Sequence, residues 1–183
     1  MSSREIDWLT GFGIMKLSYT PLSIYYLTNS EKRMYSREEL KQLKKEFWEG
    51  FGTYCSLVPA LKRRKSKFML YNTKMKGVEL KFDATRKGAS VILEINLSNT
   101  KQRLEKYEQF KLYKSTMEKQ FPHGLIWDLA YIRECGTEVS RIYTEKNDID
   151  LHRRIQWMEF YQFMATEMMK LEKAFKLVKE VME

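Results

Sequence analysis

Apolar residues recur at intervals of three and four between Ser36 and Pro59, which is the spacing of one face of an α-helix. The segment opens with "SREE", a capping box in which Ser36 accepts from the Glu39 amide and the Glu39 side chain reaches back. We therefore predict an amphipathic helix that ends near Pro59. Its apolar positions are Leu40, Leu43, Phe47, Phe51, Tyr54 and Val58.

The period changes to two in "VELKFDATRKGASVILEI", residues 78–95. Apolar residues occupy every second position from Val78 to Ala84 and again from Ala89 to Leu97, with polar residues between them. The "TRKG" segment is typical of a turn, in which Gly88 is free to adopt positive φ. The pattern predicts an antiparallel hairpin with one buried face.

Three more elements and a weaker strand complete the predicted fold. A helix runs from a cap at Asn99 to about Gln120; a second hairpin pairs "LIWDLAYI" with "EVSRIYTE" across the turn "ECGT". A final helix of about 30 residues follows "KNDID", which is long for a globular protein. Phe68–Tyr71 is a weaker strand candidate. The order α-β-β-α-β-β-α predicts a single α+β domain over residues 34–183, an antiparallel sheet of two hairpins packed by three helices.

The first 33 residues show little period, and Pro21 interrupts any helix there. No small-residue cleavage site accompanies their apolar residues, so they do not read as a signal peptide. Met34 directly precedes the first strong helix signal. We expect residues 1–33 to be an N-terminal arm, upstream of a biological start at Met34.

Composition narrows the function classes. The formal net charge is +9, which permits an acidic partner such as nucleic acid. No apolar run approaches the roughly 20 residues that a bilayer requires, so no membrane association is expected. The two cysteines, Cys55 and Cys135, form no CxxC motif, and a reducing cytoplasm is the expected location. His123 and His152 lack neighbours at zinc-ligand spacing, and no phosphate-binding glycine loop occurs.

Four segments resemble the bacterial family called domain of unknown function 4268. They are "MYSREELKQLKKEFWEGFGTY", "KGVELKFDATRKGASVILEI", "GLIWDLAYIRECGTEVSRIYTE" and "MMKLEKAFK". The resemblance covers residues 34–183 and implies no agreed activity. In longer members a similar domain follows a nuclease-like domain of the PD-(D/E)xK type, which implies a link to nucleic-acid metabolism or defence.

One hypothesis is a divergent metal-dependent nuclease. If Ala84 pairs with Ala89, Glu79 faces Glu94 on the polar side of the hairpin, with Lys81 beside them. Paired carboxylates with a lysine suit Mg²⁺ or Mn²⁺. Asn96 stands where the nuclease pattern requires lysine, and Asp83 falls opposite Ser90, too far from Glu94 for one metal. The alternative is a solvated sheet face on which Lys81 pairs across the strands.

The leading hypothesis is a non-enzymatic binding or accessory module whose favoured partner is nucleic acid. A basic and aromatic segment, supplemented by one strand residue, provides candidate phosphate and base contacts. The alternative role for Arg141 is a structural bond to a carboxylate such as Asp128 on the paired strand. The candidate nucleic-acid-binding residues are Lys62, Arg63, Arg64, Lys65, Lys67, Tyr71 and Arg141.

A third hypothesis is a homodimer formed through the last helix. Apolar and aromatic residues occupy more than one of its faces, as expected of a helix buried on two sides. The alternative is a central helix within the core of one chain. The residues that suggest these readings are Trp157, Met158, Phe160, Tyr161, Phe163, Met164, Met168 and Met169.

Overall fold

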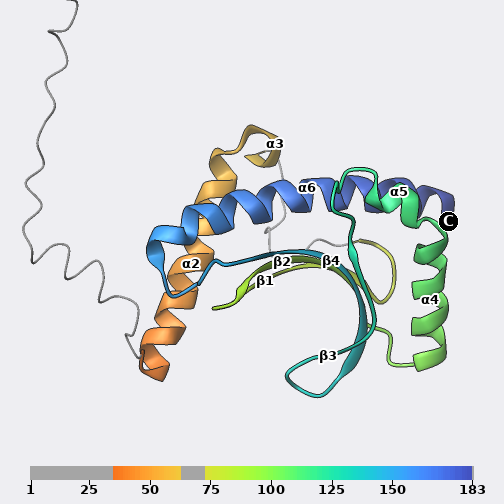
Figure 1. Cartoon of the computed structure of the whole chain (residues 1–183), viewed down its shortest axis with the longest axis horizontal. Coiled ribbons are helices and arrows are strands. Elements are labelled where there is room, and N and C mark those ends of the chain that lie inside the picture. Colours follow the sequence, from red (N-terminus) through yellow and green to blue (C-terminus); the bar gives the residue numbers. More distant parts are fainter. Residues whose placement is uncertain (1–34, 63–72, 183) are drawn as a thin grey trace, which may run out of the picture. The chain divides into compact units, whose positions relative to one another are not determined.

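A four-stranded antiparallel sheet forms the centre of the computed structural model, which describes residues 35–62 and 73–182. The strand order is β1-β2-β4-β3, and the predicted α+β class and element order are confirmed (Figure 1). The expected arm at 1–33, the basic residues 63–67 and the weaker strand at 68–71 lie outside the described residues. The strands are β1 (Val78–Ala84), β2 (Gly88–Ile95), β3 (Ile126–Ile132) and β4 (Glu138–Asn147).

The first hairpin has the predicted register. Ala84 lies opposite Ala89, and Glu79 lies opposite Glu94. Gly88 has a φ of +151°, and a Cβ atom there would collide with the Lys146 carbonyl oxygen on β4. Glycine at this position therefore allows the turn and the neighbouring strand to approach closely.

The second hairpin is also confirmed, but it joins the sheet through β4, which pairs with β2. Helices α4 (Thr100–Leu112) and α5 (Lys114–Glu118) connect β2 to β3. They replace the single helix predicted from Asn99 to Gln120, because the helix is interrupted at Tyr113. The Asn99 cap is present, with its side chain accepting from the Gln102 amide at 3.0 Å.

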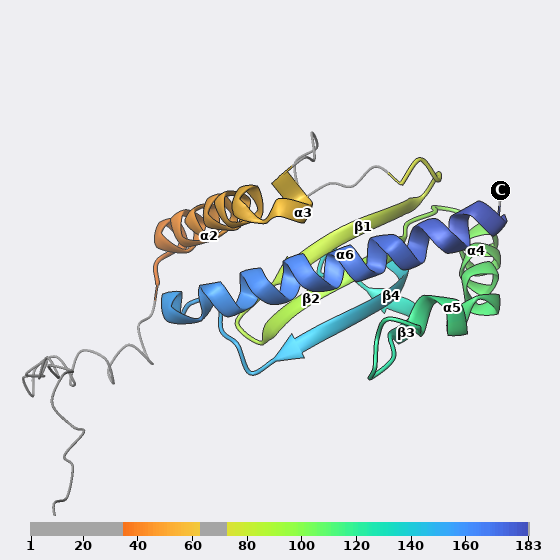
Figure 2. The same ribbon diagram turned by 90° about the horizontal axis from the view of Figure 1, so that it is seen from above.

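Helix α6 (Trp157–Met182) lies along one face of the sheet (Figure 2). It has 26 residues and begins later than predicted, after a short 3₁₀ helix, η2 (Arg154–Gln156). Ile155 of η2 is 85% exposed, whereas Met164 and Met168 of α6 are buried in the core of the chain. The alternative of a core helix is thus observed for these methionines, and homodimerisation stays a prediction.

Helix α2 (Arg37–Leu57) has the predicted capping box, in which Ser36 Oγ accepts from the Glu39 amide and Glu39 Oε2 accepts from the Ser36 amide. A short helix that the sequence did not predict, α3 (Pro59–Lys62), follows it. The Phe51 ring packs edge-on against Phe82 of β1 at a centroid distance of 5.1 Å. These contacts place α2 along the β1 side of the sheet.

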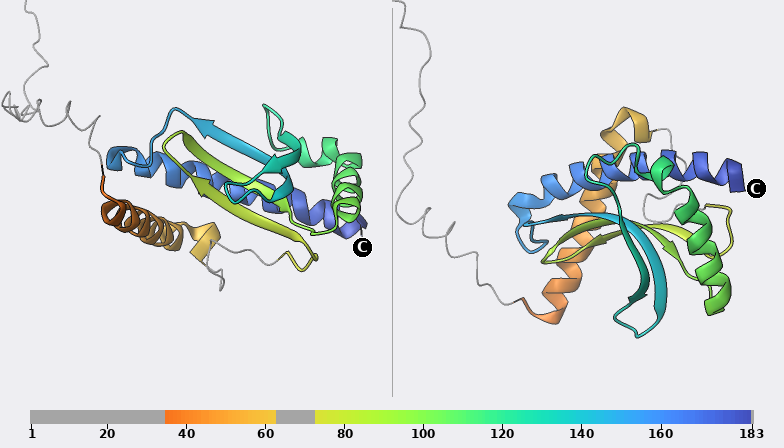
Figure 3. Two further views of the ribbon diagram at one scale, coloured as in Figure 1. Left: turned by 90° about the horizontal axis from the view of Figure 1, so that it is seen from below. Right: turned by 45° about the vertical axis from the view of Figure 1, so that its right-hand side comes forward.

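Among the described residues, no helix crosses the sheet face opposite α6 (Figure 3, left). The β3–β4 hairpin curls away from α6 toward this side (Figure 1). Arg103 of α4 supports the curl, because its guanidinium donates to the Leu129 carbonyl at 2.9 Å and to Ser140 Oγ at 3.0 Å.

The hairpin of β1 and β2 was predicted to bury one face, and this is wrong for β2. Ile92 and Glu94 point to the face opposite α6, yet they are 3% and 0% exposed. β2 is flanked by strands on both sides, and the curled hairpin returns over this face. Within the described ranges, no helix combines the length and apolar character needed to cross a membrane.

Candidate functional site

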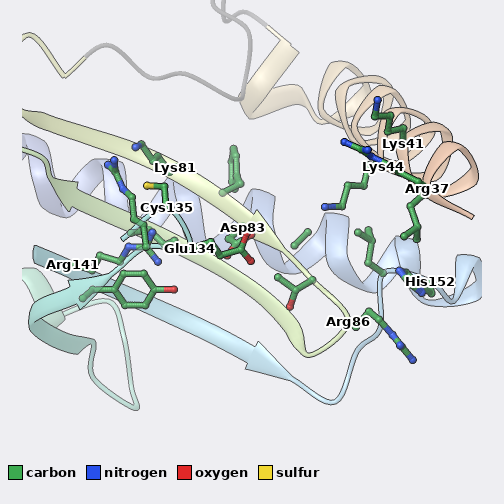
Figure 4. Close-up of a pocket in the computed structure, with 18 residues that line it drawn as sticks. Arg37, Lys41, Lys44, Lys81, Asp83, Arg86, Glu134, Cys135, Arg141 and His152 are labelled. Carbon is green, nitrogen blue, oxygen red and sulfur yellow. The ribbon is translucent and has the colours of Figure 1, made fainter. Parts of the chain in front are cut away.

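A groove of about 970 Å³ opens on the sheet face opposite α6 (Figure 4). Its sides come from the first half of α2, from β1 and from the β3–β4 hairpin, and Leu151 and His152 follow from the segment after β4. These segments are far apart in the sequence. The groove therefore exists only because the hairpin curls and α2 packs beside β1.

Positive charge dominates this groove. Seven of its 18 lining residues are lysine or arginine, and two, Asp83 and Glu134, are acidic. In Figure 4 the labelled cations of α2 lie at one end, and Lys81 and Arg141 lie at the other. The seven basic residues are Arg37, Lys41, Lys44, Lys81, Arg86, Arg133 and Arg141.

Glu94 organises the cations at the sheet end of the groove. Its side chain is fully buried. Lys81 Nζ lies 2.6 Å from Oε1, and Arg141 donates to Oε2 from Nε at 3.0 Å. Arg133, brought back by the curled hairpin, also donates to Oε1. One carboxylate thus holds three cations from β1, β4 and the hairpin turn.

The charge balance of this cluster sets the pKa of Glu94. Burial alone raises the pKa of the carboxyl, but the hydrogen bonds from Arg133 and Lys81, together with their charges, outweigh burial and hold it below its ordinary value. The pKa of Arg133 is correspondingly raised, first by its hydrogen bond to Glu94. Glu94 is therefore an anion at neutral pH, with basic side chains directed onto it.

The two acids of the nuclease hypothesis do face each other, with Lys81 between them. Lys81 Nζ lies 2.7 Å from Glu79 Oε2 as well as 2.6 Å from Glu94 Oε1. Asp83 lies opposite Ser90, as predicted. No group of three or more His, Cys, Asp or Glu side chains within the described residues is arranged to hold a metal ion. A lysine, rather than a third acid, joins the two carboxylates.

Arg141 and Tyr131 form a stacked pair in the groove. The Arg141 guanidinium carbon lies 3.5 Å from the centroid of the Tyr131 ring, a cation–π distance. Arg141 does bond a carboxylate, but the partner is Glu94 rather than Asp128. Asp128 is its register neighbour, and its Oδ1 accepts instead from the Ala130 amide. Arg141 is only 13% exposed, so most of its surface is used inside the protein.

The α2 side of the groove was not predicted as a site. Arg37, Lys41 and Lys44 are exposed, and none forms an ion pair with a carboxylate of the described residues. Their spacing of four and three residues puts them on one face of the helix. This spacing can be recognised in the sequence. The position of these three cations relative to the sheet cannot, because it depends on how α2 packs.

Two further titratable groups line the groove. Cys135 is exposed, and hydrogen bonding to Thr137 first, then the charge of Arg133, lowers the pKa of its thiol. Burial, aided by the charges of Arg86 and Lys44, lowers the pKa of His152 although Asp150 opposes it. The neutral imidazole is therefore favoured at neutral pH. Cys55, by contrast, is buried on α2.

The predicted basic segment contributes little to the described structure. Lys62 ends α3, whereas Arg63, Arg64, Lys65, Lys67 and Tyr71 lie outside the described residues. Of the predicted nucleic-acid-binding residues, the structure places Arg141 in the groove. It brings Arg141 together with Lys81 and Glu94, which belonged to the competing hypothesis.

Comparison with known proteins identifies the family. Neither the curated proteins nor the solved structures include a match to this chain. The sequence model of one protein family, described as Domain of unknown function (DUF4268), matches residues 43–179. This range includes all four strands and most of α2 and α6. The resemblance inferred from the sequence motifs is thereby confirmed, and the chain belongs to the DUF4268 family.

Proposed function

We propose that this protein is a non-enzymatic nucleic-acid-binding module, and that the basic groove on the open sheet face is its binding surface. The observation that carries the proposal is the set of seven lysine and arginine side chains around one groove, against two acids. A formal net charge of +9 for the whole chain favours the approach of a polyanion.

The distribution of the cations favours a chain of phosphates over a single small anion. Arg37, Lys41 and Lys44 come from α2, while Arg133 and Arg141 come from the second hairpin. In Figure 4 the three α2 cations and Arg141 lie toward different ends of the groove instead of converging on one point. A phosphodiester backbone presents charges at regular intervals, so it can contact both groups at once.

The cations of the two ends have different roles. At the sheet end, Lys81, Arg133 and Arg141 are partly neutralised by Glu94 and are held in position. On α2, Lys41 and Lys44 have exposed side chains that can release counterions when they meet phosphate. The α2 lysines should therefore supply most of the salt-dependent affinity.

This assignment predicts a large effect of reversing two charges. We expect the double substitution Lys41→Glu and Lys44→Glu to weaken binding by at least about tenfold at low salt and to reduce the salt slope. Fluorescence anisotropy with labelled single- and double-stranded DNA and RNA, across about 50–300 mM salt, measures both quantities.

The matched control reverses Lys173 and Lys176. They are exposed, they also lie three residues apart on a helix, and α6 is on the other face of the sheet. This control should bind as the unchanged protein does. The proposal is overturned if the full chain binds no nucleic acid at low salt, or if both double variants lose affinity equally. A separate reversal of Arg63 and Arg64 tests the predicted basic segment.

The metal-dependent nuclease is the second candidate, supported by the direct pairing of Glu79 with Glu94 across β1 and β2. Adding Mg²⁺ or Mn²⁺ to the same binding series tests it. Cleavage that requires the metal and disappears in Glu79→Gln, which keeps the buried Glu94 and its ion pairs, would establish catalysis and replace the non-enzymatic proposal. Intact oligonucleotide after prolonged incubation with either metal would exclude this activity for the substrates used.

A further inference from the structure

We infer that the groove selects single-stranded nucleic acid, with an unpaired base stacking on the Tyr131–Arg141 pair while the cations of α2 contact the backbone. This inference rests on the proposed function and deepens it by naming the class of strand. It follows from two features of the groove: an aromatic platform and a separate row of cations.

The platform is preorganised by contacts within the protein. The Tyr131 ring has one face against the Arg141 guanidinium, whose carbon is 3.5 Å from the ring centroid. Arg141 is in turn held by Glu94 Oε2 through Nε at 3.0 Å and Nη2 at 2.9 Å. A ring backed by a guanidinium that already pairs with a buried carboxylate loses little conformational entropy on binding, which favours stacking of a flat ligand.

Tyr131 is positioned to meet such a ligand. It is half-buried and lines the groove, so part of its side chain stays accessible. The bases of a single strand can turn their faces toward a protein, whereas those of a duplex are stacked and paired with each other.

The cations of α2 are placed to contact the sugar–phosphate backbone of the same single strand. Figure 4 places Lys41 and Lys44 across the groove from Arg141. A strand lying in the groove can therefore direct its phosphates toward α2 and a base toward Tyr131. Basic side chains that contact the backbone, combined with an aromatic ring on which a base can stack, are the physical requirements for binding single strands without sequence preference.

Base stacking is tested by removing the ring and by removing the bases. We expect Tyr131→Ala to weaken binding of labelled oligothymidylate roughly tenfold, the loss typical of one base–aromatic contact. Tyr131→Phe, which keeps the ring, should bind nearly as the unchanged protein does. An abasic strand of equal length, which retains only sugar and phosphate, should bind both Tyr131 variants equally.

The abasic strand also controls for folding, since Tyr131→Ala must still bind it through the cations. A duplex of equal length should bind the unchanged protein more weakly than oligothymidylate. Equal binding of duplex, abasic strand and oligothymidylate would overturn the inference and leave the proposed function standing. So would a Tyr131→Ala protein that lost the same affinity for all three probes. If the unchanged protein bound none of the three probes, the proposed function itself would be overturned.

Discussion

Glu79 and Glu94 show how burial changes the contribution of a glutamate charge to stability. They face each other across β1 and β2, and both contact Lys81 Nζ, at 2.7 and 2.6 Å. Glu79 is 47% exposed, and water screens its charge. Glu94 is fully buried and depends on its three cations for the interactions that water would otherwise supply.

Removing the charge of Glu94 should therefore cost far more than removing that of Glu79. We expect Glu94→Gln to lower the free energy of unfolding by about 3–5 kcal/mol, because three cations lose a buried partner. Glu79→Gln should change it by less than about 1 kcal/mol. Chemical denaturation at neutral pH measures both values, and similar losses would contradict the role assigned to Glu94.

The ion pairs of Glu94 should also make the stability of the protein depend on pH in acid. Because the pKa of folded Glu94 lies below its ordinary value, its contribution to stability is present above the unfolded pKa and disappears as pH falls through the folded pKa. The difference in stability between the unchanged protein and Glu94→Gln should therefore shrink on acidification below about pH 4.5. A difference that stays constant down to acid unfolding would argue against an ionised Glu94.

At the scale of the element, α2 places two glycines in contrasting surroundings two residues apart. A Cβ atom on Gly50 would collide with the Tyr161 hydroxyl of α6, whereas one on Gly52 would meet nothing within 4 Å. Glycine inside a helix is less favourable than alanine. At position 50 the close approach of α6 leaves no room for a Cβ atom, and this outweighs the lower helix propensity of glycine.

Alanine should consequently have opposite effects at the two positions. We expect Gly52→Ala to stabilise the protein by up to about 1 kcal/mol through helix propensity alone. Gly50→Ala should destabilise it by about 1–3 kcal/mol, because the Tyr161 side chain must shift. Thermal unfolding of the two variants provides the comparison. Stabilisation by both would mean that α2 and α6 are not packed as described.

At the scale of the whole molecule, Tyr161 joins two elements that are distant in sequence. Its hydroxyl donates to the Phe47 carbonyl at 2.9 Å, which links α6 to α2. Burial raises the pKa of Tyr161 to about 12, against a small opposing effect of Arg154. The folded protein therefore favours the neutral phenol more strongly than the unfolded chain does.

This link should weaken in alkali. A raised folded pKa means that the contribution of Tyr161 is complete below the unfolded value of 10.0 and is lost as pH rises toward about 12. We expect the stability advantage of the unchanged protein over Tyr161→Phe, about 1 kcal/mol near neutrality, to vanish within this range. Urea denaturation at several pH values between 9 and 11 tests it, and a constant difference would refute the assignment.

The fold was predictable where local patterns were strong. The Ser36 capping box, the Asn99 cap, both hairpins and the Glu79–Glu94 register follow from hydrophobic period and turn chemistry. Helix boundaries were less predictable: the interruption at Tyr113 and the late start of α6 at Trp157 lie in segments that still contain apolar residues. Apolar residues outside a helix can pack on the core equally well, as Leu151 does.

The candidate site was only partly predictable. Glu79, Lys81, Glu94 and Arg141 were recognised, but as members of two competing hypotheses. Arg133 and the α2 cations were missed, because their importance arises from contacts across long sequence separations. Arg133, for example, reaches Glu94 over a separation of 39 residues.

Local sequence patterns were enough to predict the α+β class, the order of the elements and the pairing inside each hairpin, because these depend on neighbours along the chain. Tertiary structure alone decided that β2 pairs with β4, that the second hairpin curls, and that α2 lies along β1. Those arrangements arise from packing between distant segments, which local period does not encode. They bury Glu94 among three cations and gather the basic side chains into one groove.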